Sequence, residues 1–475
     1  MSSHAPHLVG GRWIDGSEPS PVLDPADGTQ VGSVASGSAA EAQAAADAAA
    51  DAARDWAGRP ARSRARLLLA AADLIDERAE DLGLLLAREA GKRLPEAVGE
   101  VRFSAEYFRW FAEEARRPDG AVHPHEAPGR RHLSVRRPAG VVASLTPWNF
   151  PCSIQARKLA PALAAGCTVV ARVSEKAPLA VTDMIRCLVD AGVPDGVVNL
   201  VHGPAAAVTE AYIAHPAVRV VTFTGSTGVG QLVMHQAAQR VVRPLLELGG
   251  NAPFVVFEDA DLELAVQGAM LAKFRNTGQS CIGANRFLVH QSVMDEFTAR
   301  FTAEVDAMTI GPGAQPEPAD LGPCIDAGRV EAVTSLVAEA VAKGAKRLTR
   351  QRDVPGGGAF CEPTLLADVP ADCGLATTEV FGPAAGIFAF SDEQEALRMA
   401  NATEMGLAGY VYTRDQARVW RMADALDTGI IGVNDPLPSV AFAPMGGTKQ
   451  SGIGREGGVT GLEEFQETHY LAIGI

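Results

Sequence analysis

The apolar residues of this chain change their spacing along the sequence, and each spacing predicts a different kind of secondary structure. From about Ser38 to Arg117, apolar residues recur at helical spacing in a background rich in Ala, Arg, Glu and Leu. Beyond Gly140, short β-branched runs alternate with helical stretches. These runs are 141–145, 168–172, 197–201 and 219–224, followed after Gly249 by 253–257, 287–290, 385–390 and 430–434. Such alternation is typical of βαβ units around a parallel sheet, so the sequence predicts an α/β fold.

Length and charge restrict the class of protein further. The 475 residues exceed the size at which a single core keeps growing, so two or three domains are expected. The net charge of −15 argues against a nucleic acid or an anionic membrane as partner. The first eleven residues lack the features of a signal peptide, and no apolar run is long enough to span a bilayer. A cytoplasmic location is therefore expected.

The seven cysteines show no Cys-x-x-Cys spacing, and the ten histidines form no cluster with them in the sequence. Neither a metal site nor a redox motif is predicted from these spacings, and reduced thiols are expected. One cysteine nevertheless stands in a segment that suggests chemistry. Phe274-Arg-Asn-Thr-Gly-Gln-Ser-Cys281 places a glycine and a cation just upstream of a thiol.

A nucleophilic cysteine needs a polar, partly open setting, because an ordinary thiol has a pKa of about 8.5 and is mostly protonated at neutral pH. Arg275, Asn276, Gln279 and Ser280 could provide that setting for Cys281. The alternative is that Cys281 is a small buried hydrophobe, which is the usual role of a cysteine. The segment by itself leaves both interpretations open.

Two other segments offer polar partners for this thiol. Glu247 precedes a Gly249-Gly250 turn and an apolar run, which places a carboxylate at the mouth of a buried strand. Asn149 lies between two prolines directly after the run that ends at Leu145, where its amide could donate a hydrogen bond. A solvated surface glutamate and a turn-forming asparagine are the commoner roles of such residues.

Taken together and in this order, these segments resemble the NAD(P)-dependent aldehyde dehydrogenases over nearly the whole chain. Three further segments match that family, namely Phe223-Thr-Gly-Ser-Thr-Gly-Val-Gly230, Glu379-Val-Phe-Gly-Pro383 and 444–456. The resemblance implies a Rossmann-like dinucleotide-binding domain (1–119 and 138–247), an α/β catalytic domain (248–458) and a small bridging β element (120–137 and 459–475). In relatives that element extends a neighbour's sheet, and exposed strand edges invite such pairing, so a homodimer or homotetramer is expected.

The resemblance also implies a cofactor site. Gly225 and Ser226 open a glycine-rich turn into a helix, where backbone N–H groups can receive the pyrophosphate. Trp148, Glu379 and Phe381 belong to the same site, the last two matching the residues that hold the nicotinamide ribose and ring. No metal is implied.

The adenosine ribose is expected at Arg172, Ser174 and Glu175, after the strand 168–172. The carboxylate of Glu175 would repel a 2′-phosphate by about 4 kcal/mol at roughly 4 Å and an effective dielectric of about 20. NAD is therefore favoured. Arg172 stands where the family usually has lysine, and a guanidinium suits a phosphate, which keeps NADP open as an alternative.

Family resemblance implies a mechanism as well. Cys281 attacks the aldehyde carbonyl, and the oxyanion is held by the Asn149 amide and the Cys281 backbone N–H. After hydride transfer to the nicotinamide, Glu247 activates the water that hydrolyses the thioester. Glu456 is either a secondary proton acceptor or a structural residue. A CoA-acylating variant is disfavoured by Glu247.

Substrate choice depends on three more residues. In the succinate-semialdehyde branch of the family, two arginines and a serine grip the distant carboxylate, and Arg157, Arg275 and Ser439 match those positions. Paired guanidiniums suit a carboxylate, although either arginine could instead make a structural ion pair. The small-molecule substrate is thus predicted to be succinate semialdehyde. Glutarate semialdehyde, an aromatic aldehyde, or a non-enzymatic protein on the same fold are the alternatives. Gly283 replaces a second cysteine found in some relatives, so no disulfide switch is expected there.

Overall fold

The computed structural model describes residues 3–16, 18–117, 119–125 and 127–475. The predicted helical region forms four consecutive helices, α1 (Ala39–Gly58), α2 (Ala61–Glu77), α3 (Ala79–Ala90) and α4 (Leu94–Glu114). Helix α1 begins at a capping box, in which Ser38 and Glu41 satisfy each other's backbone N–H groups. Its alanines at 42, 45, 46 and 49 form a buried stripe, because small residues at helical spacing allow close packing.

The first set of predicted runs forms the centre of an eight-stranded sheet, in the order β22-β12-β11-β8-β9-β10-β2-β3. Its parallel strands are β8 (Val141–Thr146), β9 (Thr168–Val173), β10 (Val198–Leu200), β11 (Val218–Thr224) and β12 (Arg243–Glu247). Antiparallel strands β2 (His7–Val9), β3 (Arg12–Ile14) and β22 (Gly452–Ile453) complete the edges. Helices α5 (Pro151–Ala165), α6 (Leu179–Asp190), α7 (Ala205–Ala214) and α8 (Thr227–Ala238) connect the strands.

The second set of runs lies in a seven-stranded sheet, in the order β15-β16-β17-β14-β13-β19-β20. The strands are β13 (Ala252–Val256), β14 (Ala284–His290), β15 (Lys346–Arg347), β16 (Thr364–Ala367), β17 (Ala384–Phe390), β19 (Ala408–Tyr412) and β20 (Ile430–Val433). All pair in parallel except β15. The surrounding helices are α9 (Leu262–Phe274), α10 (Met294–Ala307), α11 (Ala327–Ala342), α12 (Gly374–Thr377), α13 (Glu393–Asn401) and α14 (Gln416–Ala425). The α/β prediction is confirmed in both sheets.

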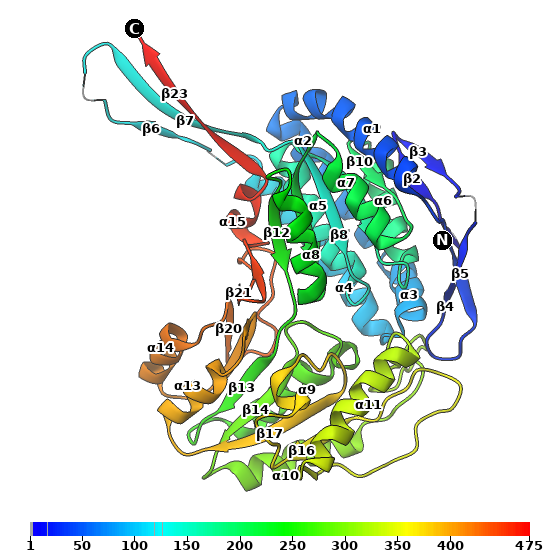
Figure 1. The fold of residues 1–475 in the computed structure, drawn as a ribbon, viewed down its shortest axis with the longest axis vertical. Helices are drawn as coiled ribbons and strands as arrows, with labels where there is room; N and C mark the ends of the chain where they lie inside the picture. The colour runs from blue at the N-terminus through cyan, green and yellow to red at the C-terminus, as the bar shows by residue number, and fades with distance from the viewer. Residues whose placement is uncertain (1–2, 17, 118, 126) are drawn as a thin grey trace.

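A three-stranded sheet forms an arm that projects from the rest of the molecule (Figure 1). It pairs β7 (Arg130–Pro138) with β6 (Ala121–His123) and with the C-terminal strand β23 (Gln466–Gly474). The predicted domain boundaries remain predictions. The short strand β22 follows the strands of the second sheet in the chain and lies within the segment 248–458. It nevertheless pairs with β12 of the first sheet.

The remaining elements are small. Strands β1 (His4–Ala5), β4 (Ser20–Leu23) and β5 (Gln30–Val34) form one sheet, and β18 (Met405–Gly406) pairs with β21 (Thr448–Lys449). A 3-10 turn, η1 (Arg275–Gly278), follows α9, and α15 (Gly458–Glu463) precedes β23. Within the described residues, no helix has both the length and the apolar character required to cross a membrane.

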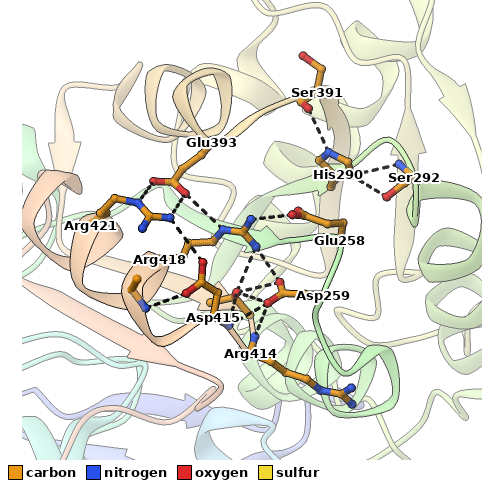
Figure 2. Close-up of polar contacts among 12 residues, drawn as sticks. Glu258, Asp259, His290, Ser292, Ser391, Glu393, Arg414, Asp415, Arg418 and Arg421 are labelled. Atoms are coloured by element: carbon orange, nitrogen blue, oxygen red, sulfur yellow. Dashed lines mark hydrogen bonds and ion pairs between the residues drawn. The ribbon is translucent and has the colours of Figure 1, made fainter.

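A charged network fastens α13 and α14 to the loop after β13 (Figure 2). Arg418 donates hydrogen bonds to Glu258 at 2.6 Å and to Asp259 at 2.8 Å, and its guanidinium lies 4.2 Å from the centre of the Phe257 ring. Asp259 also accepts hydrogen bonds from the backbone N–H groups of Arg414 and Asp415, each at 2.9 Å. Because the N–H donors named here find carboxylate acceptors, this network holds α14 against the loop that follows β13 of the second sheet.

Candidate active site

The segment that carries Cys281 is held in an unusual backbone conformation. Asn276 and Thr277 in η1 have φ angles of 53° and 58°, which is rare for residues with side chains and especially for a β-branched one. The strain is offset by specific bonds. Thr277 Oγ1 donates to Gly322 O at 3.1 Å, and Asn276 Nδ2 donates to Asn149 O at 2.9 Å. The loop is therefore fixed to the end of β8, where Asn149 lies.

These bonds change the role expected for two polar residues of the loop. Asn276 and Gln279 are 3% and 1% exposed, and their side chains bond backbone groups rather than the thiol. That they make the surroundings of Cys281 polar stays a prediction, and the observed role of both amides is to hold the loop. Their contribution is to fix the position of the nucleophile.

The Gly249-Gly250 turn lets a second segment approach the nucleophile. A Cβ atom on Gly250 would lie 2.3 Å from the carbonyl oxygen of Cys281, which no side chain could tolerate. The turn follows β12, whose last residue is Glu247. Three segments that are far apart in the sequence therefore meet at Cys281, because β8, β12 and the loop after α9 end at the same place.

Cys281 lies where two cavities meet. The larger has a volume of about 310 Å³, and Arg157, Arg275 and Ser439 line it together with the thiol. Phe103, Phe150, Ile154, Ile282, Leu437 and Met445 supply much of its apolar wall. The smaller cavity has a volume of about 210 Å³ and is lined by Trp148, Asn149, Gly225, Ser226, Glu379 and Phe381, among others. A nucleophile open to two cavities can meet one ligand from each side.

Glu247 is the acid next to the thiol. Its side chain is 1% exposed, and its Oε2 accepts a hydrogen bond from Arg157 at 3.1 Å. The pKa of Cys281 lies well above its usual value, because burial and then the negative charge of Glu247 disfavour the thiolate, while Arg157 opposes them. These effects favour the thiol over the thiolate, and the Glu247 carboxylate lies beside it.

Asn149 is held so that its amide can face the substrate. Its Nδ2 donates one hydrogen bond, to Gln279 O at 3.1 Å, and an amide nitrogen carries two protons. The backbone oxygen of Asn149 accepts a bond from Lys92 Nζ at 2.8 Å, and Lys92 is paired with Glu100 at 2.5 Å. One amide proton therefore remains for an oxyanion formed at the Cys281 side.

Arg157 is more deeply engaged than its predicted role requires. Its guanidinium pairs with Glu247 at 3.1 Å and with Glu456 at 2.6 Å, and it is 5% exposed. Although burial opposes it, Lys158 and Arg157 hold the pKa of Glu456 below its usual value. Arg157 thus lines the larger cavity and also neutralises two buried carboxylates.

Arg275 differs from Arg157. It is partly exposed, and its guanidinium lies 5.0 Å from the centre of the Phe150 ring. Glu96 lines the same cavity but forms its ion pair with Arg93, at 4.0 Å. In the described part of the chain, no ion pair engages Arg275, so its charge is the one left to a ligand in this cavity.

The smaller cavity contains the turn predicted to bind a pyrophosphate. Ser226 immediately precedes α8, and its side chain makes no capping hydrogen bond. The Ser226 hydroxyl therefore pairs with none of the N–H groups in the first turn of α8. The rings of Trp148 and Phe381 meet edge to face at 5.5 Å. Glu379 accepts a bond from Gly250 N at 3.1 Å, and burial, opposed by that bond, raises its pKa to about 7.

A model of the aldehyde dehydrogenase family matches residues 13–471 of this chain. The chain belongs to the aldehyde dehydrogenase family. It is 43% identical to the glutarate-semialdehyde dehydrogenase of Pseudomonas aeruginosa, over 98% of this chain and 97% of the relative. A succinate-semialdehyde dehydrogenase of Escherichia coli, named for NADP(+), is 42% identical over the same shares of the two chains. Betaine aldehyde dehydrogenase of Staphylococcus aureus, solved with NAD+, has a TM-score of 0.95 and 33% identity, with 99% of this chain and 94% of that chain covered.

The predicted ribose-binding residues of this aldehyde dehydrogenase lie at the end of β9, outside the two cavities. Arg172 pairs with Glu175 at 2.5 Å and donates to Gly203 O at 3.2 Å. Ser174 is buried and accepts a bond from Lys176 N at 3.3 Å. Because β9 neighbours β8 in the sheet, these residues share an edge with Trp148 and Asn149.

Three residues near the active site of this aldehyde dehydrogenase escaped the sequence analysis. Lys92 and Glu100 lie around the start of α4 and position Asn149 and the first turn of α5, where Glu100 accepts bonds from Cys152 N at 3.0 Å and Ser153 N at 3.2 Å. Arg329, on α11, lines the smaller cavity. In the sequence, each of these three is simply a charged residue in or beside a helical stretch. Such residues are ordinarily exposed to solvent, so they do not stand out.

Proposed function

We propose that this aldehyde dehydrogenase oxidises succinate semialdehyde, with NAD as the hydride acceptor. The observation that supports the substrate is the shared cavity of about 310 Å³, in which Arg275, Arg157 and Ser439 lie with Cys281. A carboxylate gripped by Arg275 would direct the aldehyde end of the same short molecule toward the thiol. Two of the three proteins compared above are named for ω-carboxy aldehydes, with five and four carbons respectively.

The first chemical step is attack of Cys281 on the aldehyde carbon. The thiol proton is released to water as the sulfur attacks, and the carbonyl oxygen becomes an oxyanion that the free amide proton of Asn149 and the Cys281 backbone N–H stabilise. The nicotinamide supplies the hydride acceptor when it is bound in the smaller cavity. Loss of hydride leaves an acyl group on sulfur as a thioester.

The second step is hydrolysis of that thioester. Glu247 acts as the base toward water, and the tetrahedral oxyanion is stabilised by the same two donors. Arg157 holds Glu247 in place and balances its charge before the proton is taken up. The products are succinate, a reduced nicotinamide and a free thiol.

Replacing Arg275 with alanine tests the substrate. The variant is expected to raise KM for succinate semialdehyde by roughly 30- to 150-fold, the equivalent of about 2 to 3 kcal/mol for a lost charge-assisted pair. Butyraldehyde has no carboxylate and should lose much less. The measurement is the ratio of kcat/KM for the two aldehydes. Arg300→Ala is the matched control, because Arg300 is an exposed cation on α10.

Equal losses for both aldehydes would show that Arg275 does not recognise a carboxylate, and the substrate would then be an aldehyde of another class. The variant Arg157→Ala cannot be used in place of Arg275→Ala for this test. Its removal would leave Glu247 and Glu456 buried without their cation, which is costly, so Arg157→Ala should impair both substrates.

Glutarate semialdehyde is the second candidate. It is one methylene longer, and a relative named for it covers the whole chain at 43% identity. A pocket wall discriminates one methylene by only about 1 to 3 kcal/mol, so the two semialdehydes should be compared directly by kcat/KM.

Cofactor choice is tested at Glu175. If the adenosine ribose binds at the end of β9 as proposed, the Glu175 carboxylate would face a 2′-phosphate, and its ion pair with Arg172 would occupy the guanidinium that could receive one. Glu175→Ser is expected to increase the ratio of kcat/KM for NADP to that for NAD by about tenfold or more, because it removes the repulsion and frees Arg172. A wild type that already prefers NADP, or a ratio that does not move, would contradict the proposal. Glu210→Ser, an exposed change on α7, serves as the control.

Two wider expectations remain predictions. The projecting arm of β6, β7 and β23 supports a homodimer or homotetramer, because an isolated three-stranded arm leaves strand edges to be covered. A cytoplasmic location is expected from the sequence.

A further inference from the structure

Two cysteines that are far apart in the sequence lie against each other behind the catalytic loop. The thiols of Cys324 and Cys361 share a hydrogen bond. Their segments are also joined through the backbone, since Cys324 N donates to Ala359 O at 2.8 Å. Both side chains belong to one small apolar core together with Cys373, and they are 0% and 5% exposed.

The segment of Cys324 is connected to the nucleophile by direct bonds. The next residue, Ile325, donates its N–H to Gln279 Oε1 at 2.9 Å, and Gly322 O receives the hydroxyl of Thr277 at 3.1 Å. Gln279 O in turn accepts the bond from the Asn149 amide at 3.1 Å. A shift at Cys324 therefore reaches both the loop of Cys281 and the residue that stabilises the oxyanion.

The segment of Cys361 has different attachments. Ala359 N donates to Pro25 O at 2.8 Å, which fastens the segment to the N-terminal part of the chain. An exposed stretch at 353–357 leads into it, and Cys361 is the more exposed of the two cysteines, at 5% against 0%. The two thiols thus lie between an exposed surface segment and the loop that carries Cys281.

We propose that Cys324 and Cys361 are a redox-sensitive pair, which a peroxide oxidises to a disulfide that lowers turnover reversibly. Cys361 is the first thiol to react, because the hydrogen bond from Cys324 lowers its pKa and so favours the nucleophilic thiolate. Its sulfur attacks one peroxide oxygen, the O–O bond breaks, and a sulfenic acid and water form.

Cys324 then attacks the sulfur of that sulfenic acid, the S–O bond breaks, and a second water leaves. In sum, two thiols and one hydrogen peroxide give one disulfide and two waters. A dithiol reductant reverses the change by thiol–disulfide exchange. Bond formation draws Cys324 toward Cys361 and moves Ile325, so the loop of Cys281 loses part of its alignment.

Peptide mapping tests the linkage. The full-length Cys281→Ala protein, which has no nucleophile to oxidise, is treated with hydrogen peroxide and digested with trypsin. The expected product links peptide 301–329 to peptide 353–398 and disappears on treatment with dithiothreitol. Because 353–398 contains both Cys361 and Cys373, Cys373→Ala should retain the link and Cys361→Ala should abolish it. Absence of the link, or a link that persists in Cys361→Ala, would overturn the proposal.

Activity tests the coupling in the protein with Cys281 present. After peroxide treatment, kcat is expected to fall by about tenfold, as misalignment of a reacting group by a fraction of an ångström can cause, and dithiothreitol should restore it. Cys361→Ala and Cys324→Val should lack this reversible loss. A disulfide that leaves turnover unchanged would overturn the coupling. The mapping needs no substrate, so its outcome is separate from that of the proposed function.

Discussion

Cys281→Ala is expected to reduce aldehyde oxidation by more than about a thousandfold while binding of the reduced cofactor changes little. The thiol forms the bond to the substrate, and no other side chain in the described part of the larger cavity is a comparable nucleophile. The smaller cavity, which is the proposed cofactor site, is lined by Trp148, Ser226, Glu379 and Phe381, and the substitution leaves these residues in place. Steady-state NADH production and fluorescence titration with NADH measure the two effects separately.

The control for this variant is Cys187→Ala. Cys187 is a buried cysteine in α6 and lines neither cavity, so the activity of Cys187→Ala should stay near that of the wild type. Appreciable turnover in Cys281→Ala would exclude covalent catalysis by this thiol. Loss of NADH binding in the same variant would instead show that the substitution disturbs the fold of the site.

The fold was largely predictable because its signals are local. Apolar runs such as 141–145 and 253–257 form strands β8 and β13, which are buried on both faces as central strands of a parallel sheet are. The convergence of Cys281, Glu247 and Asn149 was predictable from the family pattern. Its physical basis is that β8 and β12 flank β11 in the same sheet, so their ends lie at one edge.

Long-range contacts between unremarkable residues were not predictable. Lys92 bonds Asn149 across 57 residues of sequence and Glu100 bonds Cys152 across 52, and nothing near Lys92 or Glu100 signals these contacts. Arg157 was expected to grip the substrate, with a structural ion pair as the alternative, and the fold places two buried carboxylates against it. Cys324 and Cys361 lack any motif spacing, and only the packing of their two segments brings the thiols together.

Glu247→Gln should separate the two chemical steps. Acylation is expected to survive, because the substitution removes the negative charge that raises the pKa of Cys281 and so allows the thiol to ionise more readily. Hydrolysis should slow by about 10² to 10⁴, the usual contribution of a general base. Rapid mixing with succinate semialdehyde and NAD should therefore show a burst of NADH close to one per active site, followed by a nearly stalled steady state.

Hydroxylamine provides the decisive control for this variant, because a strong neutral nucleophile attacks a thioester without needing a base. Its addition should restore turnover in Glu247→Gln and yield the hydroxamate of succinate, while Cys281→Ala should remain inactive. A variant that shows no burst would place the essential role of Glu247 in the first step, as the acceptor of the thiol proton. Because the Glu247 carboxylate lies against the thiol, it is close enough to act in either step, and the burst distinguishes which step depends on it.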